Sequence, residues 1–93
     1  MLNKPTKCAD GFTMSVQASA YHYCSPRITG LAIYNNYEIG YPSEAEPLLM
    51  PYAEDADHPT DTVYGYVPVQ VLVDVIAKHG GVANIVRNKK ENE

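Results

Sequence analysis

Apolar and polar residues alternate without a break from position 12 to position 20. A period of two places the apolar side chains on one face of an extended chain, so this stretch predicts a half-buried strand. The strand either ends near Ala20 or continues to Cys24, where Ser25-Pro26 stops it because proline has no amide proton for pairing. The apolar face of this strand consists of Phe12, Met14, Val16, Ala18 and Ala20.

A second extended region is predicted from Leu31 to Tyr41, after a turn at residues 27–30. Asn35-Asn36 within it indicates either a bulge or a tight turn that splits the segment, which changes the number of strands but not the fold class. Because successive strands joined by a short link usually pair antiparallel, the two regions predict a hairpin. One face of the second region is expected to carry Ile33, Tyr37, Ile39 and Tyr41.

The pattern changes to a helical period after Pro68, which suits the first position of a helix. Apolar residues recur at i, i+3, i+4, i+7 and i+8 and predict one buried face. Gly80 is suited to the left-handed residue that closes a helix. Alternating valines from Val67 to Val75 also permit a strand, but its second face would mix polar and apolar residues, so we favour the helix. Its predicted buried face is Val69, Leu72, Val73, Ile76 and Ala77.

The remaining segments complete a single predicted domain, residues 1–93. Short strands are expected at Val63–Val67 and Val82–Arg87, a loose lead-in at residues 1–10, and a frayed charged tail at residues 88–93. Residues 42–61 form a proline-rich acidic loop in which Leu48, Leu49, Met50 and Tyr52 provide an apolar clamp. The predicted fold is α+β, an antiparallel sheet of three or four strands with one amphipathic helix packed on one face.

Charge is distributed unevenly along the chain. No Lys or Arg occurs from Ile28 to Ala77, whereas this span holds eight Asp and Glu residues, and the net charge of the chain is −4. Such a region repels phosphate, so direct binding to nucleic acid is disfavoured. No apolar run approaches the ~20 residues needed to cross a bilayer, and no export signal is evident. We therefore expect a cytoplasmic protein with Cys8 and Cys24 as free thiols.

No sequence motif indicates a catalytic or metal site. His22 and Cys24 share a strand face, but a zinc site needs three or four ligands, and the usual ligand spacings are missing. The acids of residues 54–61 depart from a calcium loop at Pro59, and neither Cys24 with His22 nor Ser25 lies in a nucleophile motif. We predict that the protein is not an enzyme and has no cofactor.

An acidic centre with many tyrosines is typical of a protein interface, because carboxylates attract a basic partner and tyrosine gives rigid contact area. The same tyrosines could instead fill the core of a small sheet, since tyrosine is a common strand residue. We predict a partner protein with a basic surface. The residues expected to bind it are Glu44, Glu46, Tyr52, Glu54, Asp55, Asp57, Asp61, Tyr64 and Tyr66.

With S-V-Q-A-S-A-Y-H-Y-C-S-P-R and Y-E-I-G-Y-P-S in a short acidic chain, the protein resembles small phage or mobile-element accessory proteins of the anti-CRISPR type. The resemblance lies in the general character of the chain, and no sequence motif is shared. It implies an inhibitor that occupies a basic nucleic-acid-binding surface of a host defence complex, such as a CRISPR effector complex, in the host cell. Two alternatives remain: a self-associating structural or assembly protein, for instance a homodimer, and a small metal- or ligand-binding enzyme.

Overall fold

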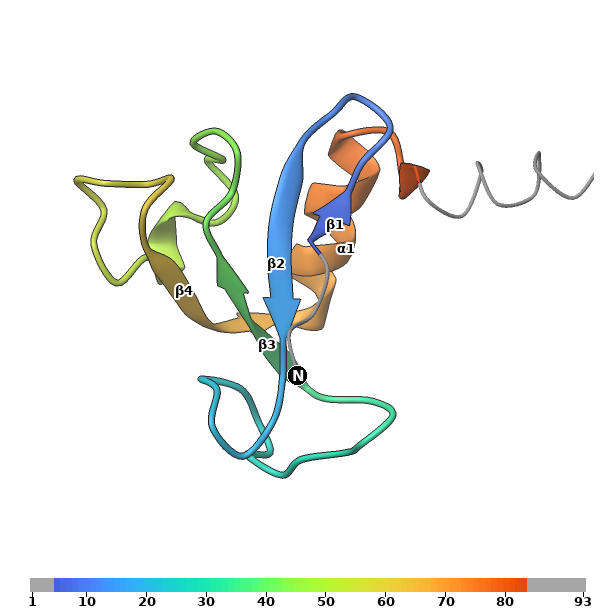
Figure 1. Cartoon of the computed structure of the whole chain (residues 1–93), viewed down its shortest axis with the longest axis vertical. Helices are drawn as coiled ribbons and strands as arrows, with labels where there is room; N and C mark the ends of the chain where they lie inside the picture. Colours follow the sequence, from blue (N-terminus) through green and yellow to red (C-terminus); the bar gives the residue numbers. More distant parts are fainter. Residues whose placement is uncertain (1–4, 84–93) are drawn as a thin grey trace, which may run out of the picture.

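The computed structural model describes residues 5–83. Its centre is a four-stranded antiparallel sheet in the order β1-β2-β3-β4, with helix α1 packed on one face (Figure 1). This arrangement confirms the predicted α+β fold. The elements are β1 (Thr6–Lys7), β2 (Thr13–Gln17), β3 (Asn36–Gly40), the 3-10 helix η1 (Met50–Tyr52), β4 (Val63–Pro68) and α1 (Val69–Lys78).

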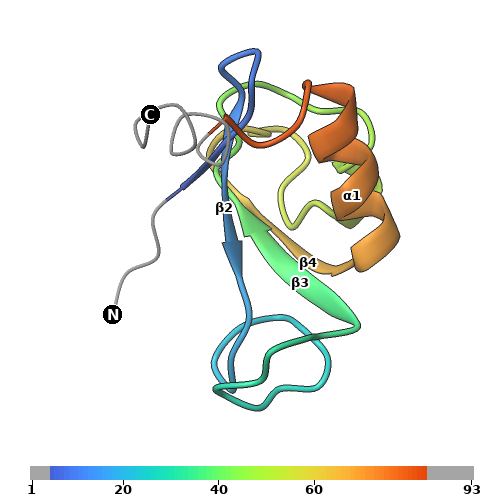
Figure 2. The same ribbon diagram turned by 90° about the vertical axis from the view of Figure 1, so that its right-hand side faces the viewer.

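Strand β2 confirms the alternating pattern over its first part. Phe12 and Met14 are buried in the core, and Val16 pairs with Ile39 of the antiparallel β3. The strand ends at Gln17, earlier than either predicted end, and the connection to β3 is not short but runs through residues 18–35. This long loop projects beyond the end of the sheet (Figure 2).

Strand β3 is shorter than the predicted region of residues 31–41. Ile39 is buried and Tyr37 packs against the core, but Ile33 and Tyr41 are exposed, so the prediction of a common buried face was wrong for these two. The reason lies in the loop before β3, which is organised by the buried Tyr34. The Tyr34 hydroxyl donates a hydrogen bond to the Ile28 carbonyl at 2.5 Å and accepts one from the Leu31 amide at 3.2 Å, so residues 28–34 are bonded within the loop.

The expectation of a loose lead-in was wrong for residues 5–10. Residues 6–7 form β1 on the edge of the sheet, and Cys8 is fully buried. Cys8 also forms an isolated antiparallel bridge with Val82, where the last strand was predicted. The rest of that predicted strand and the tail at residues 88–93 lie outside the described residues.

Strand β4 runs directly into α1. Pro68 pairs with Asn36 as the last residue of the strand and also precedes the first helical residue, without a side-chain cap. The helix ends at Lys78, and Gly80 has φ +91°, as its predicted closing role requires.

The buried face of α1 differs from the predicted one. Leu72 and Val75 are buried and Ile76 is partly buried, whereas Val69 and Val73 are 45% and 51% exposed. The observed buried side shares Leu72 and Ile76 with the predicted face, but it includes Val75 in place of Val69, Val73 and Ala77, which are exposed. The buried side of the helix continues from Leu72 and Val75 to His79. The His79 side chain is hydrogen-bonded to Glu46 inside the protein, and this contact sets the rotation of the helix.

We expect Val75→Ala to lower the free energy of unfolding by about 2 kcal/mol, because it removes two methyl groups from the core and leaves a cavity. The matched change Val73→Ala on the exposed side of the helix should alter it by less than about 0.5 kcal/mol. Urea denaturation of both variants measures the difference. Equal losses at the two positions would contradict the observed rotation of α1.

Candidate functional site

Segment 42–62 connects β3 to β4 and covers the outer edge of β4 at its first two residues. Ala53 pairs with Tyr64, and the Glu54 amide donates to the Val63 carbonyl at 2.9 Å. Leu49 is fully buried, and Met50 and Tyr52 pack against the core, as the predicted apolar clamp requires, but Leu48 is exposed. The segment is therefore attached to the sheet along its middle.

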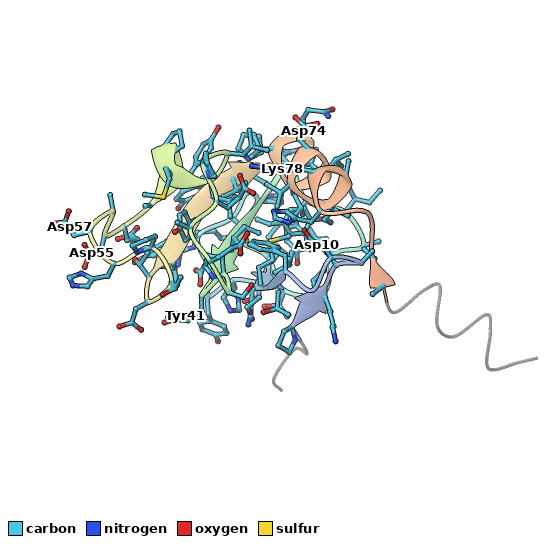
Figure 3. All side chains as sticks on the ribbon, turned by 90° about the horizontal axis from the view of Figure 1, so that it is seen from above. Asp10, Tyr41, Asp55, Asp57, Asp74 and Lys78 are labelled. Atoms are coloured by element: carbon cyan, nitrogen blue, oxygen red, sulfur yellow. The ribbon has the colours of Figure 1, made fainter. Side chains whose placement is uncertain are left out.

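The acidic loop, residues 54–61, projects from the end of this segment. Figure 3 shows Asp55 and Asp57 far from Asp10 and Lys78, at the opposite side of the molecule. All four of its acidic side chains are exposed: Glu54, Asp55, Asp57 and Asp61. The structure thus brings these four predicted site residues together on one loop.

Hydrogen bonds to Asp55 give the acidic loop its shape. One carboxylate oxygen accepts the Asp57 amide at 3.1 Å, and the other lies 2.9 Å from Nδ1 of His58. The His58 hydrogen bond, followed by that from the Asp57 amide, lowers the pKa of Asp55 below 3.8. The Asp55 amide in turn donates to Oγ1 of Thr62 at 3.1 Å. Asp55 therefore has a local structural role, and the other three carboxylates are better placed for a partner.

Tyr64 lies under this loop and does not face a partner. Its ring is fully buried in the core, and its hydroxyl donates to the Pro59 carbonyl at 2.5 Å. Burial raises the pKa of Tyr64 above 10.0. The prediction that Tyr64 is a surface anchor was wrong, because its hydroxyl satisfies a loop carbonyl from the inside.

The other predicted site residues fall in different environments. Glu44 is exposed, Tyr52 is half-buried against the core, and Tyr66 is exposed. Tyr66 has φ +53° at an irregularity where β4 carries an extra residue opposite β3, and its ring lies 6.0 Å from that of Tyr23. Tyr66 therefore belongs with the loop 18–35 rather than with the acidic loop.

Glu46 is the second residue that the sequence placed incorrectly on the surface. It is 1% exposed and accepts hydrogen bonds from three groups. Its Oε2 lies 2.8 Å from the Leu48 amide and 3.0 Å from Nζ of Lys78, and its Oε1 lies 2.7 Å from Nε2 of His79. Glu46 is thus a buried member of an ionic cluster and does not face a partner.

This ionic cluster contains Asp10, Glu46, Lys78 and His79. Nδ1 of His79 lies 2.6 Å from Oδ2 of Asp10, and the His79 ring stacks on Phe12 with centroids 4.1 Å apart. Two acids and two bases make the cluster neutral when all four are charged. Sequence reasoning missed the cluster because its members come from three separate segments, and only the unusual position of His79 on the apolar stripe of the helix could have indicated it.

Burial and hydrogen bonds have opposite effects on these groups. For Glu46, burial alone raises the pKa, but the hydrogen bonds from Leu48, His79 and Lys78 together bring it below 4.5. The pKa of Asp10 is below 3.8, chiefly because of the Phe12 amide and then His79. The hydrogen bond to Glu46 is the main reason that the pKa of His79 is above 6.5. All three shifts favour the charged cluster.

The loop 18–35 exposes a group of apolar side chains that the sequence pattern did not indicate. Tyr21 is 87% exposed and Ile33 79%, and Tyr23, Ile28 and Leu31 are also exposed. The guanidinium of Arg27 lies 5.7 Å from the centre of the Tyr23 ring. The signal was hidden because all of these residues except Ile28 fell in the extended regions that the sequence pattern predicted, and Ile28 fell in the predicted turn at residues 27–30.

Two of the side chains considered for nucleophilic or metal chemistry, His22 and Cys24, are hydrogen-bonded within the loop 18–35. Nδ1 of His22 lies 2.6 Å from Oγ of Ser19, and the buried thiol of Cys24 donates to the Ser19 carbonyl at 3.3 Å. Cys8 is likewise a buried free thiol. Within residues 5–83, no three His, Cys, Asp or Glu side chains are grouped to hold a metal ion.

Comparison of the chain with protein family models, characterised proteins and solved structures finds no match. None of the helices in the described part of the chain has the length and apolar character to span a membrane.

Proposed function

We propose that this protein is a small protein-binding module whose acidic loop docks on a basic surface of a partner protein. The observation that carries the proposal is that four exposed carboxylates project on one loop that is fixed at its base. Three hydrogen bonds fix it: Glu54 amide to Val63, Asp55 amide to Thr62, and Tyr64 hydroxyl to Pro59. A loop ordered before binding loses less conformational entropy in the complex.

The proposed partner is a basic, nucleic-acid-binding surface of a host defence complex, with a CRISPR effector complex as the first candidate. The carboxylates of the acidic loop would occupy the positions of phosphates. The absence of Lys and Arg from Ile28 to Ala77 supports this, because no nearby positive charge in the sequence offsets the acids. Such binding should weaken as salt increases, since exposed charges are screened.

Reversing three charges with Glu54→Lys, Asp57→Lys and Asp61→Lys should weaken partner binding by at least about tenfold and leave the melting temperature unchanged. Asp55 is left intact because it shapes the loop. The partner is captured from host lysate at low salt and identified by mass spectrometry, and its affinity is then measured by biolayer interferometry.

The matched control compares Asp57→Lys with Asp74→Lys, which makes the same change on the exposed side of α1, away from the acidic loop (Figure 3). Only Asp57→Lys should weaken binding. If the triple variant binds as tightly as the natural chain, the acidic loop is not the interface.

A second candidate function, self-association, is favoured by the exposed Val69 and Val73 on α1. The sheet edges offer less, because β1 has two residues and the edge of β4 is bonded to segment 42–62 at Val63 and Tyr64 and to Tyr23 at Tyr66. The association of a helix-mediated dimer would be unchanged or stronger at high salt, and Val69→Lys and Val73→Lys would dissociate it. Sedimentation analysis measures both effects. The acidic-loop complex responds to salt in the opposite way.

A further inference from the structure

His79 joins three parts of the chain that are distant in sequence. It follows the last residue of α1, its Nε2 contacts Glu46 in segment 42–62, and its Nδ1 contacts Asp10 in the β1–β2 turn, residues 8–12. The two nitrogen–oxygen distances are 2.7 Å and 2.6 Å, and the ring is 5% exposed. A single buried ring therefore connects the turn, the helix end and the segment.

Both ring nitrogens face carboxylates, and this fixes the charge of the ring. A carboxylate only accepts hydrogen bonds, and a neutral imidazole has one donor and one acceptor. Two such short contacts are satisfied together when the ring is an imidazolium, which donates from both nitrogens. Each carboxylate also receives a backbone hydrogen bond, from Phe12 to Asp10 and from Leu48 to Glu46, and these favour its ionised form.

The two links differ in what happens when the ring loses a proton. The Glu46 carboxylate is 1% exposed, whereas the Asp10 side chain is 49% exposed. A neutral ring can keep only one link, and water can solvate Asp10 but not Glu46. The proton should therefore remain on Nε2, and the Nδ1 lone pair would then face Asp10 and repel it.

The other charged and titratable groups of the described chain support this asymmetry. Glu46 also accepts hydrogen bonds from Lys78 Nζ and the Leu48 amide, and neither donor depends on the proton of His79. On the side of the turn, Asp10 is accompanied by the buried thiol of Cys8, and burial followed by the nearby Asp10 raises the pKa of this thiol above 9.0. Cys8 thus stays a neutral thiol to a higher pH than an exposed cysteine would.

We propose that His79 is a pH-operated latch: its charged ring holds the β1–β2 turn against the end of α1, and loss of its Nδ1 proton releases the turn while Glu46 stays bound. The turn would then lose its ionic link and keep the stacking of Phe12 on the ring and two backbone hydrogen bonds, Ala9 amide to Gly81 and Asp10 amide to His79, at 2.8 Å and 3.2 Å. The latch is independent of the proposed partner and is tested on the free protein.

The direction of the response follows from the cluster. The pKa of His79 is raised above 6.5, so its stabilising contribution is complete below pH 6.5 and is lost as pH rises through its folded pKa. The pKa values of Asp10 and Glu46 are lowered below 3.8 and 4.5, so their contributions are complete above these values and are lost in acid. The latch is therefore closed throughout the range from about pH 4.5 to 6.5, and it opens as the pH rises through the raised pKa of His79.

The test is a titration of the natural chain by NMR from about pH 5 to about pH 9, following the His79 ring nitrogens and amide hydrogen exchange. We expect both nitrogens protonated at the acidic end and only Nε2 protonated at the basic end. Across the same transition, the protection factors of the Asp10 and Phe12 amides should fall by about tenfold, and those of Leu48 and Leu49 should not change.

Two results for the ring itself overturn the proposal: a ring already neutral at the acidic end, or a neutral ring that keeps its proton on Nδ1. Unchanged protection in the turn, or an equal loss at Leu48 and Leu49, would also overturn it. His79→Gln cannot become charged and should abolish the transition. His58→Gln removes an exposed histidine that pairs with Asp55 and should leave the transition intact.

Discussion

Replacing Glu46 by alanine is expected to lower the free energy of unfolding by about 3–5 kcal/mol, the usual effect of removing one partner of a buried ion pair. The substitution leaves the buried His79 ring and the amine of Lys78 without their shared carboxylate, and the Leu48 amide without its acceptor. A domain of this size has a stability of only ~5–15 kcal/mol, so the variant should lie close to unfolding.

Urea denaturation at about pH 6 measures this loss, because all charged members of the cluster contribute there. The control is Glu44→Ala, two residues earlier on the same segment, where the side chain is exposed and the effect should stay within about 0.5 kcal/mol. Similar stabilities of the two variants would show that Glu46 is not held as the structure describes.

Replacing Tyr64 by alanine is also expected to lower the free energy of unfolding by about 3–5 kcal/mol, because it removes a fully buried aromatic ring and leaves a cavity. Tyr64→Phe keeps the ring and removes the hydrogen bond to Pro59, at a cost of about 1–2 kcal/mol. The two variants separate the packing of the ring from the attachment of the acidic loop.

Thermal and urea denaturation measure both changes, and amide exchange of Asp61 and His58 reports on the acidic loop. In Tyr64→Phe we expect faster exchange in the loop with little change in β2. Tyr21→Ala is the control, because that ring is 87% exposed and its loss should have little effect on stability. A destabilisation by Tyr64→Ala no greater than that of Tyr21→Ala would contradict the assigned core.

Glu46 and Tyr64 show why composition misleads about a site. Both were predicted to face a partner, because carboxylates and tyrosines are common on binding surfaces, and both are buried. Nothing next to Glu46 in the sequence distinguishes it from Glu44. The difference arises because Glu46 meets His79, 33 residues away, and finds enough donors to offset its desolvation.

The exposed acidic loop, in contrast, was foreseeable. Prolines at both sides of residues 54–58 prevent regular pairing, and closely spaced carboxylates repel each other and favour solvent. Its four acids are all exposed in the structure. Their role in binding remains a proposal, which the charge-reversal experiment tests.

The sequence by itself determined the α+β class, the core of β2, strand β4, the existence of α1 and its termination at Gly80. These features depend on contacts between residues near each other in the chain, which leave a period of two or 3.6 in the pattern of apolar residues. Backbone conformation at glycine and proline is equally local.

Only the tertiary structure decided the pairing of β1, the length of the loop 18–35, the rotation of α1 and the ionic cluster around His79. Each depends on groups that are distant in sequence: β1 on β2, the helix rotation on the burial of His79, and His79 on Asp10 and Glu46. Such contacts leave no period in the sequence. They are selected by the free energy of the whole packed chain, in which a buried charge is tolerated where its hydrogen-bonding partners converge.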